Sequence, residues 1–319
     1  MSLSMPTNIP LIEFLLASYL GISGVRKRSL SPSGGIAAFV VGFSMLAVPL
    51  RSFGISLIIF YLVGSKATKV GKERKAKLEE GHEEAGYRNA SQVLCNSFSA
   101  YIASMLWSAS FVSGSILSAI FSSVVPPQEP YDSSKWCAIS PDVSNGLSRV
   151  LVFIALGHFA CCLGDTLASE LGILSKSAPR LITTFKVVPP GTNGGVSVTG
   201  TLASVFGGFI MGATLGITLL IESSACRNNL STILPLVAWG SLAGLVGSLI
   251  DSLLGATIQR TRFSSKSKQI LTDESKVPTS GPDVRVVSGL DILSNNQVNL
   301  LSSILTAVLL GWLACNFPS

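Results

Sequence analysis

The sequence has few charged side chains and few histidines, and this scarcity excludes several kinds of protein. Only 13% of its 319 residues are Asp, Glu, Lys or Arg, about half of the roughly 25% that is usual in soluble domains. Two histidines and six cysteines without metal-ligand spacing exclude a zinc site of recognisable pattern. No GxxxxGK string followed by Ser or Thr is present, which excludes a P-loop. We expect no nucleic-acid partner.

Apolar residues are abundant, and they gather in long stretches. The hydrophobic fraction is 48% and the mean hydropathy is +0.54, values typical of an integral membrane protein. We therefore predict an all-α fold, a polytopic helical bundle in the lipid bilayer. The apolar stretches lie at about 10–25, 34–50, 52–64, 92–125, 150–163, 196–221, 233–254 and 297–316.

The distribution of basic residues indicates how often the chain crosses the membrane, because Lys and Arg accumulate on the cytoplasmic side. If 92–125 crosses once, there are eight spans and both termini lie outside the cytoplasm. Three large cytoplasmic loops then follow, at 65–91, 164–195 and 256–295. All but four of the 23 basic residues fall on the cytoplasmic side; the exceptions are Arg51, Lys135, Arg149 and Arg227. A double crossing by 92–125 would remove this asymmetry, so we predict eight transmembrane helices.

The N-terminal segment carries no sign of a targeting sequence. It has no basic n-region and no Arg/Ser-rich amphipathic stretch before its apolar run. We expect a retained first span, in a plasma membrane or endomembrane rather than a plastid. Cys137 and Cys226 both fall in predicted outside loops, and whether they pair is left open.

The three cytoplasmic loops differ in character. In the loop 65–91 a basic block precedes an acidic one, and we interpret Lys72 to Lys77 as a solvated arm that touches lipid headgroups. Arg88 and Asn96 close this loop on a polar face that includes Gln92. The loop 256–295 is polar and interrupted by Pro and Gly, so we expect it to be mobile. We interpret His82 and His158 as structural.

Two apolar segments contain carboxylates, which are costly in a membrane and by default mark functional sites or buried pairs. In a helix over 164–173, Asp165 lies on a face of small residues, while Glu170 points elsewhere. Asp251 lies within a stripe formed with Gly244, Gly247 and Gly255. A glycine stripe alone indicates close helix packing, but a carboxylate in it needs a cation, a metal or a donor.

A glycine-rich loop and a third polar stripe complete the candidate site. Gly191, Thr192, Asn193, Gly194 and Gly195 open a helix after a Pro-Pro turn, and Lys176, Arg180 and Lys186 lie on the same side. Free amides at a helix N-terminus bind phosphate. The last span adds Asn295, Asn299, Ser302 and Thr306 on one face, and the stripes can converge near the cytoplasmic surface.

These residues predict a cytoplasmic site for a phosphorylated lipid. Asp165 and Asp251 would bind Mg²⁺, which proteins commonly hold with one or two carboxylates and substrate phosphates. The spans would hold an isoprenoid tail. The alternative, hydrogen bonds between helices and nothing more, stays open.

Several strings closely resemble the transmembrane protein 19 family, across nearly the whole chain. They include GYRNASQVLCN, GDTLASELG, LSKSAPRLITTFKVVPPGTNGGVSVTG and GSLAGLVGSLIDSLLGATIQ. The family includes a plant phytyl-phosphate kinase and a plant glucose-responsive growth regulator, and the chain looks more like the regulator. More distantly, Gly164, Asp165, Ala168 and Gly172 are similar to the GDxxAxxxG element of CTP-dependent polyprenol kinases.

The resemblance implies a CTP-using membrane enzyme, a kinase of a phytyl or polyprenyl monophosphate. In that case Asp165 and Asp251, with Glu170 as a further carboxylate, would be the catalytic residues. Arg88, Asn96 and Asn299, the three basic residues of 164–195 and the glycine-rich loop would bind the substrates. A non-catalytic regulator of glucose-responsive growth and a transporter are the alternatives.

Overall fold

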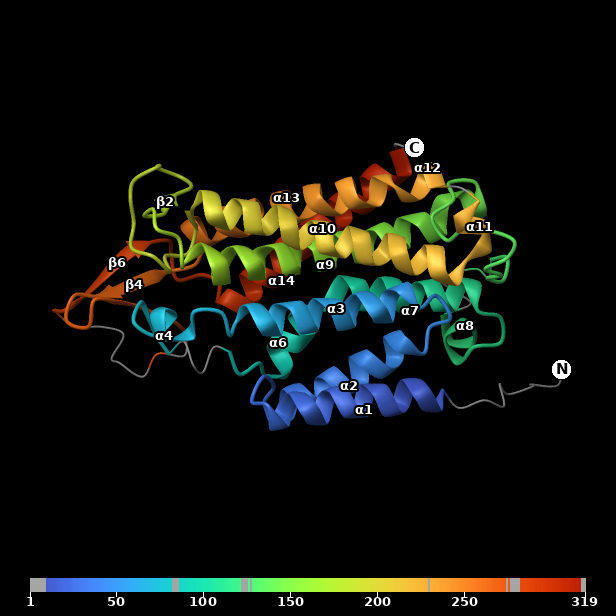
Figure 1. Cartoon of the computed structure of the whole chain (residues 1–319), viewed down its shortest axis with the longest axis horizontal. Coiled ribbons are helices and arrows are strands. Elements are labelled where there is room, and N and C mark those ends of the chain that lie inside the picture. Colours follow the sequence, from blue (N-terminus) through green and yellow to red (C-terminus); the bar gives the residue numbers. More distant parts are fainter. Residues whose placement is uncertain are drawn as a thin grey trace.

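The computed structural model describes residues 10–81, 86–121, 126, 128–228, 230–273, 275 and 282–316. Helices dominate this part of the chain, and they run back and forth along the long axis of the molecule (Figure 1). The longer helices are α1 (Leu11–Arg26), α2 (Pro32–Leu46), α3 (Ser52–Ala67), α7 (Phe98–Phe111), α9 (Leu147–Gly172), α10 (Val198–Glu222), α13 (Pro235–Ile258) and α14 (Asn295–Asn316). The short ones are α4 (Lys72–Lys75), α6 (Ala90–Cys95), α8 (Ile116–Phe121), α11 (Ser224–Arg227), α12 (Leu230–Ile233) and the 3₁₀ turn η1 (Val143–Gly146).

The two ends of the bundle are different. The described parts of the segments 65–91, 164–195 and 256–295 gather at one end, on the left of Figure 1, which we call the loop end. Helices α8, α11 and α12 lie at the opposite end, as do the beginning of α1 and the end of α14. This alternation follows the path that the sequence analysis predicts.

The prediction of a helical membrane bundle is confirmed. Within the described residues, four segments are long and apolar enough to cross a membrane: Val143–Gly172, Val198–Glu222, Pro235–Ile258 and Asn295–Asn316. Helices α2 and α3 are apolar but shorter. The apolar stretch 92–125 contains α6, α7 and α8 in place of one continuous helix. The number of crossings stays a prediction.

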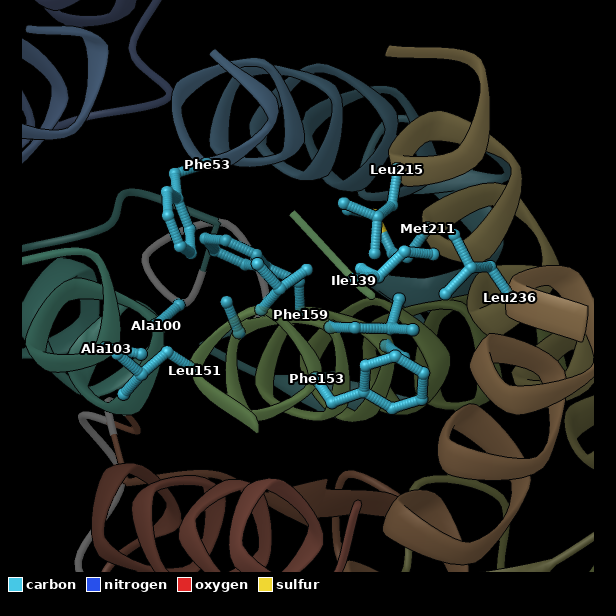
Figure 2. Close-up of a cluster of buried hydrophobic side chains, with 14 of the residues drawn as sticks. Phe53, Ala100, Ala103, Ile139, Leu151, Phe153, Phe159, Met211, Leu215 and Leu236 are labelled. Carbon is cyan, nitrogen blue, oxygen red and sulfur yellow. The ribbon is translucent and has the colours of Figure 1, made fainter. Parts of the chain in front are cut away.

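Helix α9 is the centre of the bundle. It packs against α3, α7, α10, α13 and α14, and 78% of its most apolar 18-residue window is buried, the largest share among the four long segments. Figure 2 shows Phe53 of α3, Leu215 of α10 and Leu236 of α13 packed around Phe153 and Phe159 of α9. Burial on all sides explains why α9 is apolar around its whole circumference.

Glycines allow α9, α10 and α13 to approach closely. A methyl group built on Gly244 of α13 would lie 2.6 Å from the carbonyl oxygen of Ser204 and 2.8 Å from the Cα of Gly208, both in α10. One built on Gly164 of α9 would lie 2.8 Å from the carbonyl oxygen of Gly244. These positions have no room for a side chain, so the predicted glycine stripe does serve helix packing.

Two small sheets lie at the loop end. Strands β1 (Glu79–Glu80), β5 (Gln269–Leu271), β4 (Thr261–Ser264) and β6 (Val284–Ser288) form one sheet in that order, with β1 parallel to β5 and the other pairs antiparallel. Strands β2 (Arg180–Leu181) and β3 (Gly195–Val196) form an antiparallel pair. The prediction of a mobile polar loop over 256–295 did not anticipate the larger sheet.

A disulfide between Cys137 and Cys226 joins the segment before η1 to α11. Helix α11, which contains Cys226, lies at the end opposite the loop end (Figure 1), and the pairing left open by the sequence is present. Disulfides persist in oxidising compartments, and this one is consistent with the predicted outside location of both loops. His158 is completely buried within α9, whereas His82 lies outside the described residues.

Candidate functional site

A cavity of about 570 Å³ lies at the loop end. The C-terminal part of α9, the first turns of α10, the last turns of α13, the first turns of α14 and the segment around α6 all border it. Its lining includes most of the residues that the sequence analysis selected: Arg88, Asn96, Asp165, Glu170, Gly191, Thr192, Asn193, Gly194, Gly195, Asp251 and Asn299. The predicted convergence of three polar stripes is therefore confirmed.

The two aspartates face this cavity from neighbouring helices. Asp165 of α9 and Asp251 of α13 are both half-buried, and they lie close enough to interact electrostatically. Ser248 Oγ donates to Asp165 Oδ1 at 3.4 Å. Ser302 Oγ donates to Asp251 Oδ2 at 2.8 Å. With the Asn299 amide oriented so that its nitrogen faces acceptors, this nitrogen donates to the same Asp251 oxygen at 3.2 Å.

These donors are all neutral. Among the described residues, neither Asp165 nor Asp251 forms an ion pair with Lys, Arg or His. Two like charges in a shared, partly desolvated site repel one another, and hydroxyl and amide donors offset only part of that cost. The pair therefore needs a cation to be stable in its ionised form.

The donor set fits Mg²⁺ better than a metal held by protein alone. In the described part of the chain, no group of three or more His, Cys, Asp or Glu side chains is placed to hold a metal ion. Mg²⁺ usually keeps waters or substrate phosphates beside one or two carboxylates. Two aspartates at the wall of a polar cavity match that arrangement.

Glu170 has a different role from the aspartates. It forms an ion pair with Lys75, whose side chain is completely buried, while 18% of the Glu170 side chain remains exposed. Lys75 Nζ also donates to the carbonyl oxygen of Ala67 at 3.1 Å. The interpretation of the basic block as a solvated arm is therefore wrong for Lys75, which fastens the end of α3 and α4 to α9. Since the charge of Glu170 is compensated, it is a poor candidate for a metal ligand.

The glycine-rich loop borders the cavity, but most of its amides are already bonded. The N–H of Thr192 donates to the carbonyl oxygen of Pro189 at 3.2 Å, and that of Gly195 donates to Thr192 at 2.9 Å. The N–H of Asn193 donates to Thr261 Oγ1 at 3.1 Å, which ties the loop to β4. The prediction of a cradle of free amides is therefore wrong for these three residues.

Close packing explains the glycines of this loop. Gly194 has a φ of +77° and lies against the carbonyl oxygen of Ser252 and the Ala256 side chain of α13. Gly191, at a φ of +88°, lies against Glu79. Left-handed backbone of this kind favours glycine. The loop thus joins α13 to the larger sheet and closes one side of the cavity.

The three basic residues selected from 164–195 lie outside the cavity. Lys176, Arg180 and Lys186 are exposed, and they are absent from the described residues that line it. Arg180 Nη1 donates to the carbonyl oxygen of Phe185 at 2.9 Å within its own hairpin.

Other cations reach the cavity instead, and the sequence analysis missed most of them. The described lining includes Lys27, Arg28, Lys69, Lys72, Arg88 and Arg260. Of these, Arg88 lies deepest, and burial lowers the pKa of its guanidinium while the negative charge of Glu170 opposes that effect. The signal that could have found Lys27 and Arg28 is their position at the cytoplasmic end of the first predicted span.

Comparisons with known proteins agree with this architecture. The family described as "Integral membrane protein DUF92" matches residues 15–307. Protein PGR of Arabidopsis thaliana is 39% identical over 92% of this chain and 92% of its own length. An uncharacterized membrane protein of Methanocaldococcus jannaschii is 30% identical over 78% of this chain and 83% of its own.

A more distant relative is Protein VTE6, chloroplastic, of Arabidopsis thaliana, which is 27% identical over 78% of this chain and 61% of its own length. No solved structure matches the chain. The family model covers the helices between α1 and α14, part of those two helices, the glycine-rich loop and both aspartates. The chain therefore belongs to the integral membrane protein family DUF92, as its resemblance to the transmembrane protein 19 family predicts.

Proposed function

We propose that this protein is a phosphotransferase that moves the γ-phosphoryl group of CTP onto an isoprenoid monophosphate at the loop end. The observation that carries the proposal is the pair Asp165 and Asp251, which share a polar cavity without a cationic partner among the described residues. A site built in this way attracts a divalent cation together with phosphate groups. The choice of CTP rests on the segment from Gly164 to Gly172, which is similar to the GDxxAxxxG element of CTP-dependent polyprenol kinases.

The chemistry requires positioning more than proton transfer. An oxygen of the acceptor monophosphate forms the new bond to the γ-phosphorus, the bond to the β–γ bridging oxygen breaks, and CDP leaves with that electron pair. The acceptor phosphate is already ionised near neutral pH, so it needs no strong base. Asp165 and Asp251 would hold Mg²⁺, which when bound neutralises the phosphate oxygens.

Cationic side chains supply the remaining charge balance. Arg88 borders the cavity beside Gln92 and Asn96, and Lys27, Arg28 and Lys69 line it as exposed side chains. All six side chains can donate hydrogen bonds to phosphate oxygens, and the four cationic ones also offset the negative charge of those oxygens. We assign Arg88 to the acceptor phosphate and the exposed cations to the nucleotide.

The direct test is an assay of purified protein with CTP, Mg²⁺ and phytyl monophosphate, with the diphosphate measured by mass spectrometry. Asp165→Asn and Asp251→Asn should each lower the rate by about 100-fold or more, because each removes charge stabilisation from the reacting phosphates. Glu222→Gln is the matched control, because it neutralises a carboxylate at the opposite end of α10, and we expect a rate within about twofold of wild type. ATP, GTP and UTP in parallel reactions decide the donor.

Absence of diphosphate product in the wild-type reaction, with a known prenyl-phosphate kinase active under the same conditions, would contradict the proposal. A non-catalytic regulator of glucose-responsive growth is the second candidate. The 39% identity to Protein PGR favours it. This alternative predicts that Asp165→Asn still complements a null mutant, whereas the kinase proposal predicts that complementation is lost.

A further inference from the structure

We infer that a small apolar cavity beside the polar one binds the part of the isoprenoid tail nearest the acceptor phosphate. This inference rests on the proposed function for the identity of the ligand. The second cavity has a volume of about 80 Å³ and lies between α1, α2, α3 and α6. One water-sized probe needs roughly 10–15 Å³, so the space admits several carbon atoms of a chain.

The two cavities meet at three residues. Arg88, Gln92 and Asn96 line both of them. A ligand with its phosphate at these side chains therefore has a polar cavity on one side and an apolar cavity on the other. That is the shape of a lipid monophosphate, whose charged end faces the nucleotide while its tail turns away.

The backbone fixes Arg88 at this junction. Its carbonyl oxygen accepts from Ser31 N at 2.9 Å, and its N–H donates to Ser29 O at 3.3 Å. Arg88 Nη1 donates to Ser65 Oγ at 3.0 Å, which leaves other guanidinium N–H groups for a phosphate. Arginine in a fixed position recognises phosphate in a bidentate manner.

Gln92 adds a neutral donor to this wall. Its Oε1 accepts from Asn89 N at 3.0 Å in a capping box that begins α6. Because the amide oxygen is engaged in this way, the amide nitrogen is the end that can bind a ligand. The capping box thus both begins the helix and orients Gln92.

Beyond the junction the second cavity is apolar. Its walls include Ala38 and Val41 of α2 and Phe60 of α3. The Tyr61 hydroxyl that also borders it bonds to Ser29 Oγ at 2.9 Å, and Ser97 Oγ donates to Val93 O at 2.9 Å. Since these polar atoms are satisfied within the protein, the part of the cavity beyond Arg88, Gln92 and Asn96 offers a ligand hydrophobic contact.

The outer face of α1 can contact the rest of a long isoprenoid tail. Helix α1 packs mainly against α2, and its outer face exposes apolar side chains such as Ile12 and Tyr19. In a bilayer such a face contacts lipid. We therefore infer that the first carbons of the tail occupy the second cavity and the remainder extends into the membrane beside α1 and α2.

The test is photolabelling with farnesyl monophosphate that carries a diazirine in its tail, on purified full-length protein in nanodiscs without nucleotide. We expect labelled peptides from α1, α2, α3 and α6, and competition by unlabelled farnesyl monophosphate. Ala38→Trp should reduce labelling by roughly tenfold, because it displaces about two buried methylenes of the ligand. Val40→Trp is the control on the same helix, since Val40 is 50% exposed and is outside the described lining.

Labels spread over the outer faces of α10 and α13, or equal labelling of Ala38→Trp and Val40→Trp, would overturn the inference. Wild-type labelling keeps the test valid if Ala38→Trp fails to fold. The labelling needs no turnover, so a failed kinase assay leaves this result interpretable. Conversely, diphosphate formation from a short, water-soluble prenyl phosphate would support the kinase even if no tail site is labelled.

Discussion

Removing the charge of Glu170 should destabilise the protein more than removing the charge of Lys75. The Lys75 side chain has no exposed area, whereas Glu170 keeps 18% because it borders the cavity. In Glu170→Met the ammonium group stays buried and keeps the Ala67 carbonyl as its partner within the described residues, and an uncompensated buried charge costs about 3–5 kcal/mol. In Lys75→Met the carboxylate can turn to cavity water, so we expect the loss of one charged hydrogen bond, about 1.5–3 kcal/mol.

The double variant sharpens this prediction. Two methionines replace the ion pair with apolar side chains of similar length, an exchange that is often neutral or stabilising. We expect the double variant to lie closer to wild type than Glu170→Met alone, as measured by reversible unfolding in mixed SDS and detergent micelles. The control is Lys135→Met, which removes an ion pair with Asp132 whose side chains are 71% and 40% exposed, and it should cost at most about 1 kcal/mol.

The reasoning fails if Lys75→Met costs as much as Glu170→Met. It fails equally if the double variant loses the sum of the two single losses, because the charges would then be independent. Equal single losses would mean that the Glu170 carboxylate reaches water no more easily than the Lys75 ammonium group, and additive losses would mean that the two charges do not interact.

Three further predictions concern packing, the disulfide and the choice of cation. Gly244→Ala should cost about 1–3 kcal/mol in the same unfolding assay, whereas Gly42→Ala, whose added methyl would meet only a side-chain carbon 3.8 Å away, should be neutral or stabilising. Cys137→Ser should lower stability by about 2–4 kcal/mol, and wild-type protein treated with reductant should match it; no difference between the two oxidation states would contradict the disulfide. Arg88→Gln should raise the KM for the lipid phosphate about tenfold, while Arg180→Gln should leave it nearly unchanged. The reverse order in steady-state kinetics would mean that Arg180, and not Arg88, binds this phosphate.

Periodic patterns made part of the site predictable. Asp165 and Asp251 each lie in an apolar helix with small residues at helical spacing, and this local pattern is enough to place both at a helix interface. Ser302 follows from the same reasoning, because its polar stripe on the last span needs a partner. All three predictions depend only on residues within one turn or two of each other.

The remaining features depend on contacts between distant segments. Strand β1 pairs with β5 from a different loop, and strands of two or three residues leave little periodicity in a sequence. The amide of Asn193 is used by Thr261, which no reading of the glycine-rich loop by itself can reveal. Likewise, the ion pair of Lys75 with Glu170 forms because the fold brings α4 to α9.

The glycines of the bundle determine how the two aspartates meet. Gly164 precedes Asp165 directly and contacts Gly244, which lies about two helical turns before Asp251. Gly247, one turn nearer to Asp251, lies against Cys161, one turn before Asp165. Because α9 and α13 lie backbone to backbone at Gly164 and Gly244, and Gly247 leaves room for the Cys161 side chain, the next side chains toward the loop end emerge beside one another where the helices border the cavity. A methyl group in the contact would separate the helices and with them the carboxylates, so the same glycines that allow close packing also set the spacing on which the proposed cation binding would depend.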